Sequence, residues 1–123
     1  METEKPHADP RANVVVDHRP WGNFRQYTLN EPSTVKIITV VAGESLSLQR
    51  HEHRDELWIA LDDGLLFEID GTTTQASTGD EFFVTRGAVH RVAGGDHGGR
   101  FLEVAFGHFD EQDIERLEDR YGR

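Results

Sequence analysis

The chain contains no cysteine. Neither a disulfide framework nor a thiolate metal site can therefore form, and any bound metal must be held by nitrogen and oxygen ligands. Basic residues are also scarce, because 13 Lys and Arg face 23 Asp and Glu, for a formal net charge of −10. Such a chain lacks the cationic surface that nucleic acid or an anionic membrane requires, so neither is an expected partner.

Long apolar runs are missing as well. No stretch approaches the ~20 apolar residues of a transmembrane helix, and Met1–Pro6 lacks the basic-then-apolar pattern of a secretory signal. We therefore expect a cytoplasmic protein. Residues 1–12 are charged and contain two prolines, which predicts a flexible N-terminal tail, and residues 13–123 are short enough to form one domain.

Short segments rich in β-branched and aromatic residues recur between turns of Gly, Asp and Asn. The strongest of these segments is Val35–Val41. Further strands are predicted at residues 13–17, 24–29, 45–51, 57–61, 65–69, 72–76, 82–84, 90–93 and 101–106. This regular spacing predicts an all-β antiparallel sandwich or barrel.

One helix is predicted at the C-terminus. Asp110 is a good N-cap residue, and Ile114, Leu117 and Tyr121 lie on one stripe of a helix that runs from Asp110 to Tyr121. We expect this helix to pack on the outside of the barrel.

The segment from Gln49 to Glu56 concentrates potential metal ligands. The preceding segment, Ser45–Leu48, alternates polar and apolar residues, which predicts a strand that places Gln49 and His51 on the same face as Ser45 and Ser47. Imidazole and carboxylate groups suit zinc, manganese, iron or nickel. His53 is the alternative to Gln49 as the ligand that accompanies His51.

A later strand begins at His90, and in a closed barrel His90 can face this group from the opposite side. Gly79 precedes it, followed after five residues by Thr85, then Gly87 and His90. The first segment has a matching order: Gly43, five residues, Gln49, then His51 and Glu56. Both patterns resemble the two motifs of the cupin superfamily, with Gln49 at the first His position and Thr85 at the Pro position. The resemblance implies a double-stranded β-helix, or jelly-roll barrel.

Within the cupins, the chain resembles the C-terminal domain of bacterial type II mannose-6-phosphate isomerases, which are often fused to a mannose-1-phosphate guanylyltransferase. The segments that carry this likeness are Arg19–Gly22, Ser45–His51, Gly87–Arg91 and Ile114–Arg123. One departure is Leu57, which stands where the family commonly has His.

The resemblance implies one divalent metal held by Gln49, His51, Glu56 and His90. Zinc is the expected metal, with manganese, iron or nickel as alternatives.

The expected function is a metal-dependent sugar-phosphate isomerase that interconverts an aldose and a ketose phosphate through an enediolate. His53 and Lys36 are the candidate groups for proton transfer, and Arg54, Arg91 and Arg123 are the candidates for binding the phosphate. Two alternatives stay open: a non-catalytic sugar-binding or sensing cupin, and a metal-dependent dioxygenase.

The same strand also predicts self-association. If Gln49 and His51 face inward, then Leu46, Leu48 and Arg50 face outward, and an exposed apolar strand face needs cover. We therefore expect a homodimer.

Overall fold

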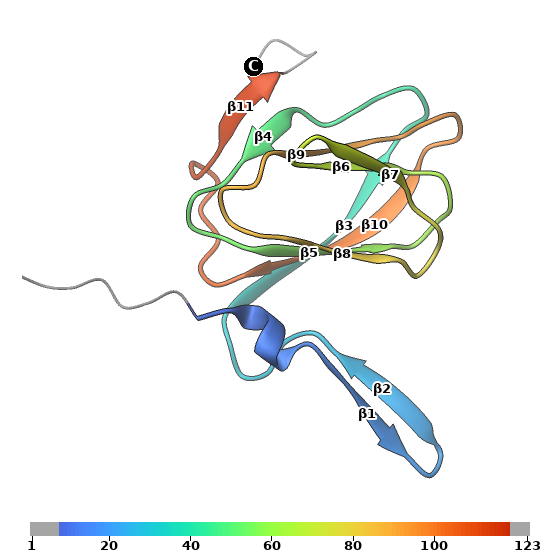
Figure 1. Cartoon of the computed structure of the whole chain (residues 1–123), viewed down its shortest axis with the longest axis vertical. Coiled ribbons are helices and arrows are strands. Elements are labelled where there is room, and N and C mark those ends of the chain that lie inside the picture. Colours follow the sequence, from blue (N-terminus) through green and yellow to red (C-terminus); the bar gives the residue numbers. More distant parts are fainter. Residues whose placement is uncertain (1–7, 119–123) are drawn as a thin grey trace, which may run out of the picture. The chain divides into compact units, whose positions relative to one another are not determined.

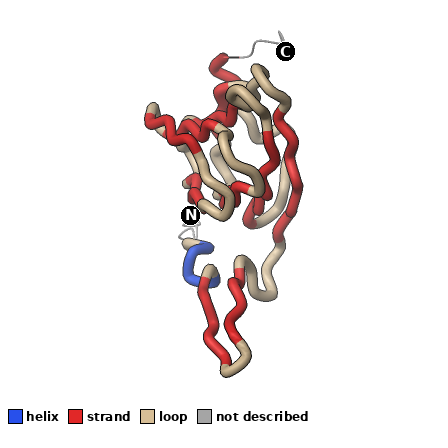
Figure 2. The backbone as a smooth tube through the Cα atoms, turned by 90° about the vertical axis from the view of Figure 1, so that its right-hand side faces the viewer, coloured by secondary structure: helices blue, strands red, loops and turns tan. Residues whose placement is uncertain are grey.

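The computed structural model describes residues 8–118. These residues fall into two compact units, one ending at Glu31 and one beginning at Pro32. Strands and loops make up nearly all of the described chain (Figure 2). Among the described residues no helix has the length and apolar character needed to cross a membrane.

The first unit consists of a short 3₁₀ helix and a β-hairpin. The 3₁₀ helix η1 (Pro10–Asn13) lies partly within the predicted tail and is capped by Asp9, whose side chain accepts a hydrogen bond from the Arg11 N–H. Strands β1 (Val15–Arg19) and β2 (Gly22–Gln26) pair antiparallel. Their connection holds two residues, Pro20 and Trp21, which form the tip of this hairpin. Residues 1–7 of the predicted tail lie outside the described residues.

The second unit contains two antiparallel sheets that face each other (Figure 1). The four-stranded sheet has the order β3 (Ser33–Val40), β10 (Gly99–Phe106), β5 (Glu56–Ala60) and β8 (Glu81–Val84). The five-stranded sheet has the order β11 (Glu115–Glu118), β4 (Leu48–Arg50), β9 (His90–Ala93), β6 (Leu66–Ile69) and β7 (Thr72–Gln75). Most neighbouring strands are distant in sequence. The predicted all-β jelly-roll barrel is therefore confirmed.

Three aromatic rings form the centre of the core between the sheets. Trp58, Phe67 and Phe101 are almost fully buried, and their ring centroids lie 5.2 to 5.7 Å apart in edge-to-face contacts. They come from β5, β6 and β10, so the cluster joins both sheets. Because Trp58 points into the core, its neighbours on the same face of the four-stranded sheet also point inward.

The predicted C-terminal helix is wrong over the described residues. The Asp110 carboxylate does accept a hydrogen bond from the Gln112 N–H, but a single turn follows and the chain then extends into β11. Strand β11 pairs with β4 and adds an ion pair of 2.7 Å between Arg50 and Glu115. Pairing with β4 satisfies backbone groups that a sheet edge leaves open, and this tertiary gain overrides the helical pattern. Residues 119–123, the end of the predicted helix, lie outside the described residues.

The register of β4 contains a one-residue shift that the alternating pattern did not predict. Ser45 pairs with Ala93, whereas Gln49 pairs with His90, so one extra residue lies between the two pairs. A shift of one residue exchanges the two faces of a strand. Ser45 is therefore not on the face of Gln49, and Leu46 packs against the core instead of facing outward. The expectation of a homodimer loses Leu46 as support and stays a prediction.

Candidate metal centre

Three buried side chains converge inside the barrel. The ligand atoms of His51, Glu56 and His90 all lie within 4.8 Å of one another, and each residue is at most 3% exposed. His51 directly follows β4 and His90 begins β9, both in the five-stranded sheet, whereas Glu56 begins β5 in the facing sheet. This set, here called the His/Glu group, therefore joins the two sheets and forms a possible metal-binding site.

Backbone carbonyls fix the orientation of both imidazoles. His51 Nδ1 lies 2.6 Å from the carbonyl oxygen of Asp113, and His90 Nδ1 lies 3.0 Å from that of Ala88. A carbonyl only accepts, so each Nδ1 carries the proton and donates it. Each Nε2 then presents its lone pair to the group, as in metal sites whose second ring nitrogen is held by a carbonyl. Burial lowers the pKa of both His51 and His90, which favours the neutral form that binds metal.

Glu56 supplies the negative charge. Burial opposes its ionisation, but nearby positive charge lowers its pKa, and with both imidazoles neutral that charge is the Arg54 guanidinium, so the carboxylate is charged. Trp58 Nε1 donates to one of its oxygens at 3.0 Å and Arg54 Nε to the other at 2.8 Å. Two neutral imidazoles and one carboxylate form a donor set that fits zinc and related divalent metals.

Arg54 lies directly against the group and is 8% exposed. Besides Glu56 it contacts His51, with 2.9 Å between Arg54 Nη2 and His51 Nε2. One lone pair cannot serve both partners, so a metal bound to this nitrogen displaces that hydrogen bond. The guanidinium also lies 4.3 Å from the centroid of the Phe109 ring, and Lys36 Nζ lies 4.1 Å from the same centroid.

Gln49 lies beside the His/Glu group. It pairs directly with His90 and is half-buried, and directly opposed residues of neighbouring strands share a face. The structure therefore brings Gln49 to the inner side of the barrel together with His90.

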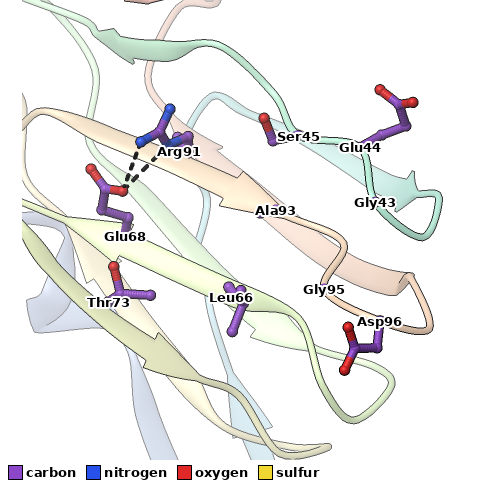
Figure 3. A pocket seen from close by; sticks show the side chains of 10 residues that line it. All are labelled: Gly43, Glu44, Ser45, Leu66, Glu68, Thr73, Arg91, Ala93, Gly95 and Asp96. Atoms are coloured by element: carbon purple, nitrogen blue, oxygen red, sulfur yellow. Dashed lines mark hydrogen bonds and ion pairs between the residues drawn. The ribbon is translucent and has the colours of Figure 1, made fainter.

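Two predicted site residues, His53 and Arg91, are not brought to the group. His53 is exposed, and its backbone N–H donates to the Asp113 carboxylate at 3.0 Å. Arg91 follows His90 and lies on the outer face of the five-stranded sheet, where it forms ion pairs of 3.1 Å with Glu68 and with Glu118. Arg91 and Glu68 line an open groove of about 490 Å³ on this outer face. Figure 3 shows the ion pair between them. Arg123 lies outside the described residues.

Glu103 is a buried acid near the group that the sequence reasoning missed. It pairs with Lys36 of β3 on one side and Trp58 of β5 on the other, so it shares their inward face. Burial raises its pKa to about 7, with the charge of Glu56 acting in the same direction and Arg54 and Lys36 opposing it. A signal was present, because Glu103 stands between Phe101 and Ala105 at the inward positions of an apolar strand.

Solved structures with a similar fold span diverse proteins. PAC13 of Streptomyces, solved with uridine, has a TM-score of 0.61 at 13% identity and covers 96% of this chain and 93% of its own. The capsular polysaccharide assembling protein CapF of Staphylococcus aureus has a TM-score of 0.64 at 14% identity and covers 85% and 34%. At these identities the neighbours show the fold alone, which is the jelly-roll barrel described above.

The sequence comparisons show the family. Residues 8–119 match the family described as Mannose-6-phosphate isomerase C-terminal, and the chain belongs to this family. Mannose-1-phosphate guanylyltransferase ManC of Salmonella typhimurium is 35% identical over 111 residues, and alginate biosynthesis protein AlgA of Pseudomonas aeruginosa is 38% identical over 108 residues. Each match covers 86% of this chain but 22% of the relative, so the chain spans about a fifth of their length.

Replacing His90 with Ala tests the ligand set. We expect zinc affinity to fall more than about 100-fold, because loss of a ligand exceeds the 10–100-fold effect of losing an outer partner. His97→Ala, an exposed histidine in the β9–β10 loop, is the matched control and should bind zinc like the original protein. Isothermal titration with zinc measures both. Zinc binding that survives His90→Ala but is lost in His53→Ala would overturn the assignment.

Asp113 provides a test of how the C-terminal segment supports the site. Its carboxylate accepts hydrogen bonds from the backbone N–H groups of Glu52 and His53 at 2.9 and 3.0 Å, and its carbonyl orients His51. Asp113→Ala should loosen this loop and weaken zinc binding about 10-fold. Asp110→Ala, whose carboxylate holds only the Gln112 N–H, should leave zinc affinity unchanged. Equal affinities in both variants would contradict this role.

Proposed function

We propose that this domain binds one divalent metal and interconverts an aldose phosphate and a ketose phosphate of the mannose 6-phosphate type. The convergence of two unprotonated Nε2 atoms and the Glu56 carboxylate inside a barrel of the mannose-6-phosphate isomerase C-terminal family carries the proposal. Aldose–ketose interconversion needs stabilisation of negative charge on a sugar oxygen, together with a group that moves a proton.

Gln49, His51, Glu56 and His90 would hold the metal. When bound, a divalent metal supplies Lewis-acid stabilisation of the charge that develops on the substrate oxygen. Zinc is the proposed metal, with manganese, iron or nickel as alternatives, because the donors are nitrogen and oxygen alone.

Cations near the group support binding of a phosphate. Lys36 and Arg54 both contact the Phe109 ring, and Arg54 also contacts the His/Glu group. Guanidinium and ammonium groups form strong charge-assisted hydrogen bonds with phosphate oxygens. Arg54 and Lys36 are therefore proposed as the phosphate-binding pair, and Arg91 on the outer face is not.

A non-catalytic sugar-binding cupin is the second candidate. It is favoured by the length comparison, because the chain spans 22% of ManC and AlgA, proteins named for guanylyl transfer and alginate biosynthesis. A domain of this size can serve a larger enzyme by binding alone.

Turnover of mannose 6-phosphate separates the two candidates. The purified zinc-loaded protein should convert mannose 6-phosphate to the ketose fructose 6-phosphate, should stop after chelation and should recover when zinc returns. His90→Ala should be inactive and His97→Ala active. Binding of mannose 6-phosphate without conversion would support the non-catalytic candidate, and conversion that persists without metal would contradict the metal-dependent mechanism.

A further inference from the structure

Glu103 occupies the middle of strand β10, which lies between β3 and β5 in the four-stranded sheet (Figure 1). Its side chain shares the inward face with Lys36 and Trp58 and is nine-tenths buried, with 9% of the residue exposed. Trp58 in turn donates to Glu56 of the His/Glu group. Glu103 is therefore one side chain away from the candidate metal centre.

The Glu103 carboxyl makes no hydrogen bond or ion pair within residues 8–118. The other two acids of the barrel with almost no exposure do: Glu56 accepts from Arg54 and Trp58, and Asp55 accepts from the Arg86 N–H at 2.7 Å. Within residues 8–118 the fully buried side-chain nitrogen or oxygen without a hydrogen-bond partner is Arg86 Nε, so the Glu103 oxygens keep some access to solvent. A carboxyl that is nine-tenths buried and has no protein partner still loses free energy, and its presence calls for an explanation. A carboxyl that must reach a substrate is one such explanation, because its partner arrives only with that substrate.

Charged and titratable groups surround Glu103 from several elements. Lys36 faces it from β3, Glu56 from β5, and Arg54 from the loop before β5. His51 and His90, from the five-stranded sheet, face Glu56. Burial and Glu56 raise the pKa of Glu103 to about 7, whereas Arg54 and Lys36 act in the opposite direction. A carboxyl placed among these groups can both accept and return a proton.

We infer that Glu103 is the catalytic acid and base that carries the proton between the two reacting carbons of the sugar phosphate. This inference rests on the proposed isomerase function. Its basis is geometric: an unpartnered carboxyl points into the barrel beside the His/Glu group, whereas His53 is exposed in a loop. Lys36, paired across the strands with Glu103, supplies positive charge next to it.

The chemical step balances with one carboxylate. Glu103 takes the proton from the carbon next to the aldehyde, the C–H electron pair forms the carbon–carbon double bond, and the carbonyl pair moves to its oxygen. The hydroxyl proton of the second carbon passes to that oxygen. The second carbon then becomes the carbonyl, and the Glu103 carboxyl returns its proton to the first carbon.

Glu103→Gln keeps the shape of the side chain and removes its proton transfer. We expect kcat for mannose 6-phosphate to fall about 100-fold or more, the usual range for a lost general base. The KM should stay the same, and the zinc content and the thermal unfolding temperature should not fall, because the buried carboxyl has no partner to lose. Glu103→Asp should keep part of the activity. Glu68→Gln, the same change on the outer face (Figure 3), is the matched control and should behave like the original protein.

Deuterium exchange gives a readout that a structural role would not change. In D₂O, proton magnetic resonance should detect deuterium entering the reacting carbons with the original protein and with Glu68→Gln, but not with Glu103→Gln. An undiminished kcat in Glu103→Gln would overturn this inference and leave the isomerase function standing. Loss of zinc or of the fold in Glu103→Gln would also overturn it. If the original protein binds zinc and mannose 6-phosphate without turnover, both proposals fail.

Discussion

The barrel depends on a buried carboxylate, Glu56, whose charge is balanced from all sides. Trp58 and Arg54 each donate to one of its oxygens, while His51 and His90 approach from the facing sheet. Removing a charge from water costs several kcal/mol unless hydrogen bonds and opposite charges compensate. The aromatic core supplies the dry surroundings, and the two sheets must stay in register for this compensation to hold.

This constraint explains how the C-terminal segment takes part. The Asp113 carboxylate accepts hydrogen bonds from the backbone N–H groups of Glu52 and His53, which holds the loop that carries the ligands. The Asp113 carbonyl sets the tautomer of His51. Strand β11 then continues along β4 and protects an edge next to the site. The segment therefore supports the site directly, through the side chain and the backbone of Asp113, rather than by packing a helix on the barrel.

The sequence predicted the fold class and all three residues of the His/Glu group, because strand alternation and motif spacing are local and survive folding. It did not predict the one-residue shift near Ser45, since a bulge depends on pairing with β9. The helix from Asp110 failed for a similar reason: the open edge of β4 lies far away in sequence. An acid at an inward position of an apolar strand was a signal for Glu103, but its place near the site becomes visible only when Lys36 and Trp58 are known to be its neighbours.

The central claim is that one divalent metal binds inside the barrel to His51, Glu56 and His90. Anomalous diffraction at the zinc absorption edge, from crystals of the zinc-loaded protein, measures this position directly. The account predicts one peak, about 2.0–2.2 Å from Nε2 of both histidines and from a Glu56 oxygen, with the Arg54 contact to His51 broken. A peak coordinated by His53, or the absence of any peak in the barrel interior, would contradict it.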